Sequence, residues 1–212
     1  MRHAEVAYFD EDETPYNPIE VPLTAVGIDQ ARAAARALEN IRLDRVLVSG
    51  LPRTVETARF VAPDAEPEIW PELTEIRGGR LTEIPEDELE VAFTRAFHGV
   101  VPSETRFLGG ETIGSLVDRV VPAVERLGAE PEWDTALAVL HGGVNRAILS
   151  YALTGERCFF GGIEQAPGCL NVLDLGDGWI VRAVNTVPYD LAHGYGRLTT
   201  MEELFRQYRP RR

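Results

Sequence analysis

Residues 45–53 read RVLVSGLPR, a short apolar run that is followed at once by glycine, proline and arginine. Valine and leucine without alternating polar positions are typical of a strand that is buried on both faces of a parallel sheet. Pro52 suits the first turn of a helix, because the N–H that proline lacks has no partner there. The stretch therefore predicts a strand, a short loop and a helix, with Arg53 close to the carboxyl end of the strand.

The same order of strand, loop and helix returns at residues 135–151. The sequence TALAVL at 135–140 predicts a second buried strand, and His141-Gly142-Gly143 follow it directly. Apolar residues then recur at helical spacing as far as Tyr151. Strands that alternate with helices predict a three-layer α/β/α sandwich around a mostly parallel central sheet.

Other segments extend this pattern with three more helices and a hairpin. Pro122 lies inside the predicted helix at 112–127 and predicts a kink or a break in it. The predicted elements are a helix capped by Thr24, a strongly amphipathic helix at 112–127, a hairpin of 170–175 and 179–184, and a last helix from near Thr200 with Glu203 as its capping partner.

The length of the chain, 212 residues, suits one domain. We expect residues 1–212 to form that single domain. Residues 66–111 are less regular, with prolines and glycines spread through them. We interpret this stretch as an insertion that packs over one end of the sheet.

The charge balance is strongly acidic, with 34 acidic residues, 21 basic residues and a formal net charge of -13. Such a surface repels nucleic acid and anionic membranes, so we expect neither as a partner. A small anionic substrate stays compatible with this charge, because a local basic pocket can oppose the global field. The sequence predicts no particular oligomeric state.

The sequence contains no apolar run of the ~18 residues that a bilayer span requires. Residues 10–13 are acidic where the apolar part of a signal peptide would lie, so we expect a cytoplasmic protein. The two cysteines, Cys158 and Cys169, are more readily interpreted as buried thiols than as a disulfide.

Polar residues that carry chemistry lie where the predicted strands end. Arg2-His3 opens the chain, Ser49 to Arg53 follow one strand and His141 follows another, while Glu75 lies at the start of the irregular stretch. In open α/β sheets, ligands bind at the carboxyl ends of the strands. Two arginines, two histidines and one glutamate are therefore expected to converge on one site.

These residue types suit phosphoryl transfer. The planar guanidinium of arginine matches phosphate oxygens, and a neutral histidine is a good nucleophile near pH 7. Arg2, Arg53 and His141 can neutralise the transferred oxygens, and Glu75 can protonate the leaving oxygen. The helix after His141 also points its positive end at the site.

The chain resembles the histidine phosphatase, or phosphoglycerate-mutase-like, superfamily, and specifically its phosphatase branch. Six collinear strings carry the resemblance: RHAE at 2–5, PLTAVGIDQA at 22–31, VLVSGLPRTVETA at 46–58, LTEIRGG at 73–79, GGET at 109–112 and VLHGGVNRAIL at 139–149. The resemblance implies that His3 becomes phosphorylated and that Arg2, Arg53 and His141 form the phosphate pocket. It implies that Glu75 is the proton donor, then the base for the attacking water, and that neither a metal nor another cofactor is needed.

Three departures from the family pattern stand out. Family members usually have an apolar strand before the Arg-His pair, and no such strand precedes Arg2. We expect that such a short segment cannot hold His3 tightly, and we hypothesise that Met1 is an internal methionine of a longer strand. RHAE replaces RHGE, with Phe9 where many relatives have asparagine, and RGGRLTEI replaces a Trp-Glu-Gly signature after Glu75.

Other charged residues are weaker candidates. His98 and His193 lie alone, outside the matching strings, and we expect structural or solvent-facing roles for them. His98 could, however, reach the site from the insertion. Arg77 and Arg80 flank glycines and could meet a second anionic group of the substrate. Residues 10–13 are better explained as a solvated acidic loop than as a cation site.

The expected activity is that of a phosphomonoesterase for a small phosphorylated metabolite. Two alternatives remain open at this point. A phosphoglycerate mutase would return the phosphoryl group to its substrate, but the spacing between Glu75 and His141 is short for a lid that excludes water. A non-catalytic binder would hold phosphate in the same pocket without turnover.

Overall fold

The computed structural model describes residues 1–9, 17, 19–94, 97–130, 132–194 and 198–208. Its central sheet has the strand order β2-β1-β3 and is parallel throughout. The strands are β1 (Arg45–Val48), β2 (Glu68–Ile69) and β3 (Ala136–Val139). Both buried strands were therefore predicted, whereas the two-residue β2 was not, because it lies in the stretch that we interpreted as an insertion.

The first residues of the chain continue the sheet on the far side of β3. Arg2 forms a parallel bridge with Leu140. The His3 amide donates to the Leu140 carbonyl at 2.8 Å, and the Leu140 amide donates to the Met1 carbonyl at 2.9 Å. Residues 1–4 are buried. The expectation that this segment cannot hold His3 tightly is wrong, because backbone pairing with the end of β3 fixes it.

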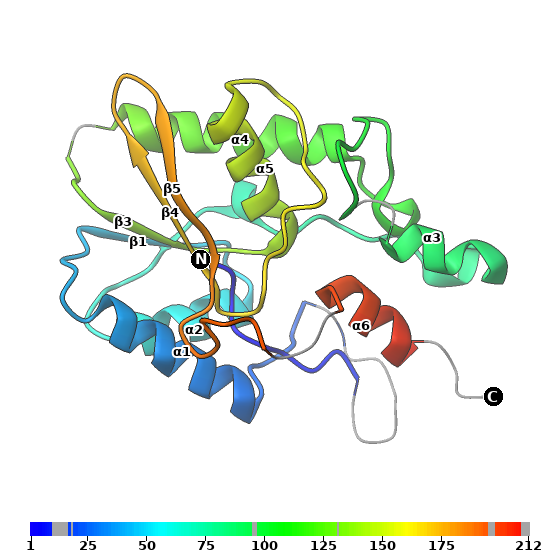
Figure 1. Cartoon of the computed structure of the whole chain (residues 1–212), viewed down its shortest axis with the longest axis horizontal. Coiled ribbons are helices and arrows are strands. Elements are labelled where there is room, and N and C mark those ends of the chain that lie inside the picture. Colours follow the sequence, from blue (N-terminus) through cyan, green and yellow to red (C-terminus); the bar gives the residue numbers. More distant parts are fainter. Residues whose placement is uncertain (10–16, 18, 95–96, 131, 195–197, 209–212) are drawn as a thin grey trace.

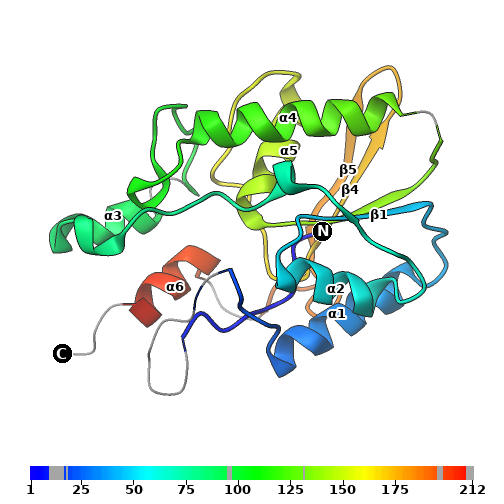
Figure 2. The ribbon, with the colours of Figure 1, turned by 180° about the vertical axis from the view of Figure 1, so that it is seen from behind.

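Two hydrophobic cores lie on opposite faces of the sheet and define three layers. Val46, Val48 and Val139 belong to the core beneath α1 (Ala25–Leu38) and α2 (Pro52–Val61). Leu47 belongs to the other core, under α4 (Ile113–Ala129) and α5 (Gly142–Thr154). Figures 1 and 2 show the two helix pairs on either side of β1 and β3. The predicted three-layer α/β/α fold is confirmed.

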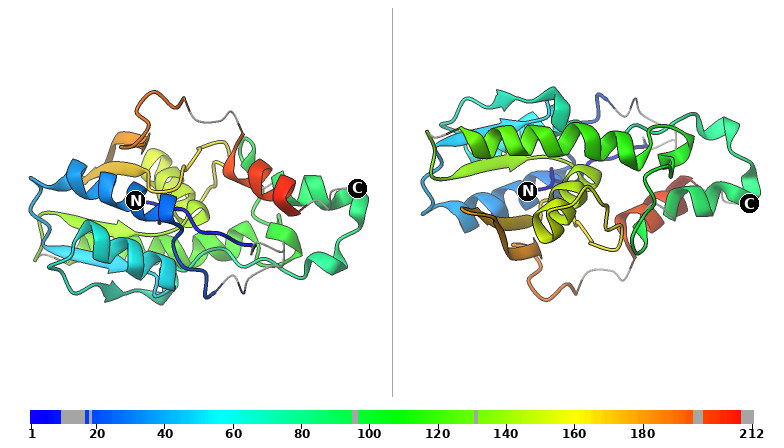
Figure 3. Two further views of the ribbon diagram at one scale, coloured as in Figure 1. Left: turned by 90° about the horizontal axis from the view of Figure 1, so that it is seen from below. Right: turned by 90° about the horizontal axis from the view of Figure 1, so that it is seen from above.

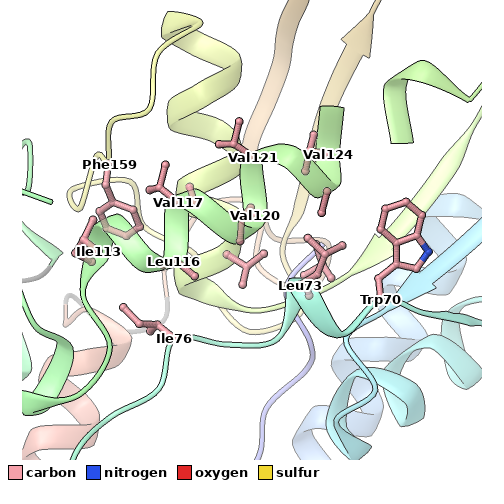
Figure 4. Packing of buried hydrophobic residues seen from close by; sticks show 14 of the residues in the cluster. Trp70, Leu73, Ile76, Ile113, Leu116, Val117, Val120, Val121, Val124 and Phe159 are labelled. Atoms are coloured by element: carbon pink, nitrogen blue, oxygen red, sulfur yellow. The ribbon is translucent and has the colours of Figure 1, made fainter. Parts of the chain in front are cut away.

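Helix α4 supplies most of the second core. Its apolar stripe includes Leu116, Val120 and Val124, which belong to the same buried cluster as Leu73 and Trp70 (Figure 4). Pro122 lies on the exposed side of this helix. The helix continues through Pro122 without the break that we considered. Asp118, whose carbonyl loses its helical hydrogen bond because proline has no N–H, is also an exposed residue.

A hairpin of β4 (Leu170–Leu175) and β5 (Trp179–Thr186) forms a separate antiparallel pair, as predicted. It packs against α5 (Figure 1). Cys158 and Cys169 are both free thiols, although only Cys169 is fully buried.

Two shorter helices meet at one end of the molecule. They are α3 (Leu89–Thr94), in the irregular stretch, and α6 (Thr200–Tyr208), the predicted last helix. The Phe93 ring packs on those of Phe205 and Tyr208, with ring centroids 5.5 Å apart in both pairs. Figure 3 shows α6 beside α3, at the end of the molecule away from the hairpin. Within the described ranges, no helix has the length and apolar character needed to span a membrane.

Candidate active site

The buried histidines His3 and His141 lie side by side where the sheet ends. His3 is 2% exposed and His141 is 0% exposed, with their ring centroids 5.2 Å apart. His141 is the residue that precedes α5, and Arg53 lies in the first turn of α2 with 4% exposure. The topology thus brings together residues that are far apart in the sequence, as the strand-end argument predicted.

The ring of His3 is held in one tautomer. Its Nδ1 lies 2.7 Å from the Ala4 carbonyl oxygen, which can only accept a hydrogen bond, so Nδ1 carries the proton. Nε2 then keeps its lone pair. Burial, followed by the charges of Arg2 and Arg53, lowers the pKa of His3 well below its usual value. His3 is therefore neutral at pH 7, which is the form that a nucleophile requires.

His141 has a polar partner on only one side of its ring. Its Nε2 is 2.8 Å from the Ser49 hydroxyl, which also contacts Thr54 at 3.1 Å. Its Nδ1 is buried and meets no hydrogen-bond partner within the described part of the chain. Burial, followed by the neighbouring His3, lowers the pKa of His141. Ser49 fixes this ring, a role that the sequence did not reveal.

Arg2 is anchored from two directions. Its Nη1 donates to the Gln165 carbonyl at 2.6 Å and to the Thr200 hydroxyl at 2.9 Å. The Gln165 side chain is itself fixed, since its Oε1 accepts from Asn145 at 3.0 Å and Asn171 at 2.7 Å. The Nε of Arg2 is buried and has no acceptor among the described residues. A buried guanidinium donor without an acceptor suits an anionic ligand.

Glu75 lies at the amino-terminal end of α5. The Gly143 amide donates to its two carboxylate oxygens at 3.1 Å and 3.3 Å, and the Ile76 amide donates to Oε1 at 2.9 Å. A Cβ at position 143 would lie 2.7 Å from Glu75 Oε1, so only glycine leaves room for this carboxylate. The Glu75 carboxylate therefore contacts the first turn of α5, at Gly143, two residues after His141 in the sequence.

Arg119 of α4 supports the main chain that carries Glu75. Its guanidinium donates to the backbone carbonyls of residues 72, 74 and 75 and to the carboxylate of Glu111. Neither Arg119 nor Glu111 was predicted as a functional residue. GGET at 109–112 gave only a weak signal, because it marks Glu111 without indicating its partner.

A cavity of about 530 Å³ opens beside Arg2 and His3. Residues 5–9 and Thr24 line one side. Helix α6 lines the other with Thr200, Glu203, Leu204 and Gln207, which recur at the spacing of one helix face. The cavity is large enough for the leaving group of a phosphate ester as well as the phosphate.

The model of the histidine phosphatase superfamily (branch 1) matches residues 1–186. The chain belongs to the histidine phosphatase superfamily. It is 29% identical over 167 residues to the adenosylcobalamin/alpha-ribazole phosphatase of Salmonella typhi, an alignment that covers 74% of this chain and 80% of that protein. It is 30% identical over 185 residues to the metal-independent phosphoserine phosphatase of Arabidopsis thaliana, with 84% and 76% covered.

Solved structures of the histidine phosphatases share the fold. The alpha-ribazole phosphatase from Shigella flexneri superposes with a TM-score of 0.67 at 24% identity, over 87% of this chain and 94% of that one. The predicted family, fold class and enzyme class, a histidine phosphatase that hydrolyses phosphoric monoesters, are thus confirmed.

The weaker candidates of this histidine phosphatase lie on its surface. Arg77 and Arg80 are exposed, and each pairs with a neighbouring glutamate, at 3.7 Å and 3.4 Å respectively. His98 and His193 are exposed as well. Residues 10–13 lie outside the described residues. Among the residues that the structure describes, no group of three or more His, Cys, Asp or Glu side chains is arranged to hold a metal ion.

Proposed function

We propose that the chain is a metal-independent phosphomonoesterase that works through a phosphohistidine on His3. The observation that carries this proposal is the hydrogen bond from His3 Nδ1 to the Ala4 carbonyl, at 2.7 Å. It leaves the Nε2 lone pair of a neutral, rigidly held imidazole for attack on phosphorus. Arg2, Arg53 and His141 surround this ring and are assigned to the phosphate oxygens.

The first half-reaction transfers the phosphoryl group to the enzyme. The Nε2 lone pair forms a bond to phosphorus while the ester P–O bond breaks. Glu75, in its acid form, gives its proton to the leaving oxygen, so the leaving group departs as a neutral alcohol. The guanidinium groups of Arg2 and Arg53 stabilise charge on the equatorial oxygens, and His141 Nδ1 can donate a hydrogen bond to one of them.

The second half-reaction releases phosphate. The Glu75 carboxylate takes a proton from a water molecule, the water oxygen bonds to phosphorus, and the N–P bond breaks. Inorganic phosphate leaves, His3 returns to the neutral state and Glu75 returns to its acid form. One glutamate can serve both steps, because the water enters where the leaving group departed.

The test compares the unmodified chain with His3→Ala in hydrolysis of p-nitrophenyl phosphate, with EDTA present. We expect turnover to survive EDTA and to fall by at least ~10³-fold in His3→Ala, since loss of a covalent nucleophile is costly. Rapid quenching in alkali should trap an acid-labile phosphoryl group on the unmodified chain. Phosphate that protects the chain against unfolding while no ester is turned over would instead support the binder.

The mutase alternative makes a different prediction for the products. A mutase returns the phosphoryl group to a bound phosphoglycerate, whereas a phosphatase delivers it to water. We expect incubation with 3-phosphoglycerate to yield no 2-phosphoglycerate. Isomerisation faster than release of phosphate would favour the mutase.

The cavity beside His3 favours a particular kind of small metabolite as the substrate. Tyr8, Phe9 and Leu204 offer apolar surface, whereas Glu5 and Glu203 supply carboxylates and Arg206 one cation. Carboxylates accept hydrogen bonds from sugar hydroxyls and repel a carboxylate on the substrate. We therefore assign an uncharged, ring-bearing sugar as the leaving group, as in the alpha-ribazole phosphate that some relatives are named for.

A panel of esters tests this assignment. We expect kcat/KM to be highest for ribose 5-phosphates that carry an aromatic base, and at least ~10-fold lower for phosphoserine and 3-phosphoglycerate, a difference of about 1.4 kcal/mol. Glu203→Lys should narrow this gap, and Glu132→Lys, the same change outside the cavity, should not. A preference for phosphoserine in the unmodified chain would contradict the assignment.

A further inference from the structure

The guanidinium of Arg119 uses all of its hydrogen-bond donors within the protein. Nη1 donates to the carbonyls of Glu72 at 2.7 Å and Thr74 at 2.6 Å. Nη2 donates to the Glu75 carbonyl at 3.2 Å and to Glu111 Oε2 at 3.2 Å, while Nε donates to Glu111 Oε1 at 2.9 Å. Arginine has five N–H donors and each has a partner here, so none is left for a phosphate. Arg119 therefore acts on the protein and not on the substrate.

The segment that Arg119 holds has few main-chain hydrogen bonds of its own, although Leu73 and Ile76 are buried on either side of it. The short helix at Pro71–Leu73 ends just before it, and Thr74 is already extended. Glu75 lies in a stretch without regular secondary structure. Carbonyl groups in such a stretch have no backbone partners from a helix or sheet ladder. Arg119 satisfies two of them, those of Thr74 and Glu75, as well as the Glu72 carbonyl of the preceding short helix. One side chain from α4 thus holds the main-chain carbonyls of Thr74 and Glu75.

Glu111 extends the same support to the other side of Glu75. Its carboxylate is paired with Arg119 and its side chain is only 4% exposed. The Arg77 amide donates to Glu111 Oε2 at 3.0 Å, and the Glu111 amide donates to the Arg77 carbonyl at 2.8 Å. The Arg119–Glu111 pair therefore fixes the chain both before and after the proposed proton donor.

The carboxylate of Glu75 tolerates little movement. It lies between the Gly143 and Ile76 amides at hydrogen-bond distance. A general acid must be within hydrogen-bond reach of the leaving oxygen, and a displacement of ~1 Å can cost ~10²-fold in rate. Support of the main chain on both sides is thus directly relevant to proton transfer.

We propose that Arg119, held by Glu111, is a positioning residue that keeps Glu75 in place for proton donation to the leaving group. This inference rests on the proposed role of Glu75 in the phosphatase reaction. It predicts a loss that depends on the substrate. An alkyl ester would release a strongly basic alkoxide, so it needs the proton from Glu75 in the transition state. p-Nitrophenolate is a stable leaving group and needs this proton much less.

The experiment measures kcat/KM for Arg119→Lys over a series of phosphate esters whose leaving groups range from p-nitrophenol through phenol to simple alcohols. We expect a loss of ~10²-fold for alkyl phosphates and a clearly smaller loss for p-nitrophenyl phosphate, since general acid catalysis contributes ~10²–10⁴-fold. The plot of log kcat/KM against leaving-group pKa should become steeper. Glu75→Gln should steepen it in the same way.

Arg126→Lys is the matched control on the same helix. Arg126 donates to the side-chain carboxylate of Glu72 at 3.0 Å, whereas Arg119 donates to the Glu72 main-chain carbonyl. The Arg126 guanidinium also stacks on Trp70, 4.2 Å from the ring centroid. It touches neither the Glu75 main chain nor Glu111 in the described contacts. We expect its leaving-group dependence to match that of the unmodified chain.

Combining the two changes separates positioning from general damage. The double variant Arg119→Lys with Glu75→Gln should be no slower on alkyl phosphates than Glu75→Gln alone, because the group to be positioned is gone. An equal loss for all esters in Arg119→Lys, or additive losses in the double variant, would overturn the proposal. Failure of the unmodified chain to hydrolyse even p-nitrophenyl phosphate would instead count against the phosphatase proposal itself.

Discussion

Two buried histidines connect the stability of this protein to pH. Burial lowers the pKa values of both His3 and His141, so both rings stay neutral in the folded chain below pH 6.5. In the unfolded chain they bind protons as pH falls through about 6.5. The unfolded state then holds more protons, so stability falls as pH falls. The same desolvation that keeps His3 neutral is therefore expected to make the fold acid-sensitive.

We expect the free energy of unfolding to decrease between pH 7 and pH 5.5, with each histidine contributing up to about 1.4 kcal/mol per pH unit at the acid end. Urea unfolding across this range would measure the slope. His141→Gln should reduce it, and His193→Gln should leave it unchanged, because that ring is exposed in the folded chain. A pH-independent free energy in the unmodified chain would contradict the prediction.

The residues that we propose to bind phosphate were recognisable in the sequence for a local reason. Arg53 and His141 each lie in a short string next to a predicted strand end, and strand ends of a parallel sheet meet at one edge. Arg2-His3 was recognisable from the string RHAE at 2–5. Gln165 and Thr200 were not recognisable, since they act on Arg2 from positions 163 and 198 residues away. Contacts of that kind depend on the folded path of the chain and leave no local pattern.

At the scale of elements, α4 begins with a side-chain cap. The Thr112 hydroxyl accepts a hydrogen bond from the Ser115 amide at 3.1 Å. Thr112→Ala should lower the free energy of unfolding by about 1 kcal/mol, the usual cost of losing such a cap. Thr112→Ser keeps the hydroxyl, so it should lower the free energy of unfolding by only a small part of that amount. Equal destabilisation by both changes would point to packing of the Thr112 methyl group instead.

Element prediction succeeded where periodicity was long and failed where segments were short. The stripe at 112–127 predicted α4 to within two residues at its end. Glu68–Ile69, in contrast, is a two-residue strand that pairs with β1, and two residues show no period. Its place in the sheet is set by β1, whose free edge it covers. Several short helical turns of the same irregular stretch escaped prediction for the same reason.

At the scale of the whole molecule, α6 connects the irregular stretch to the site. One face of α6 lines the cavity, while Phe205 and Tyr208 pack on Phe93 of α3. The cavity wall that we assign to the leaving group is therefore held in place by contacts made outside the cavity. Substrate preference should respond to residues that no substrate touches.

Phe205→Ala tests this connection. We expect KM for a ribose 5-phosphate with an aromatic base to rise by ~10-fold, about 1.4 kcal/mol, while kcat for p-nitrophenyl phosphate changes little. Val91→Ala, at an exposed position of α3, is the control. Equal effects on both substrates would show that α6 affects the chemical step and not leaving-group binding.

The hydrogen bond between Arg2 and Thr200 joins positions 198 residues apart. A ribosome delivers the two partners at different times of synthesis, because Arg2 is made 198 residues before Thr200. Every other proposed phosphate ligand is already outside before this contact can form. The nascent chain is therefore expected to gain its full affinity for phosphate only after Thr200 has left the ribosome, and the appearance of that affinity would report when this contact forms.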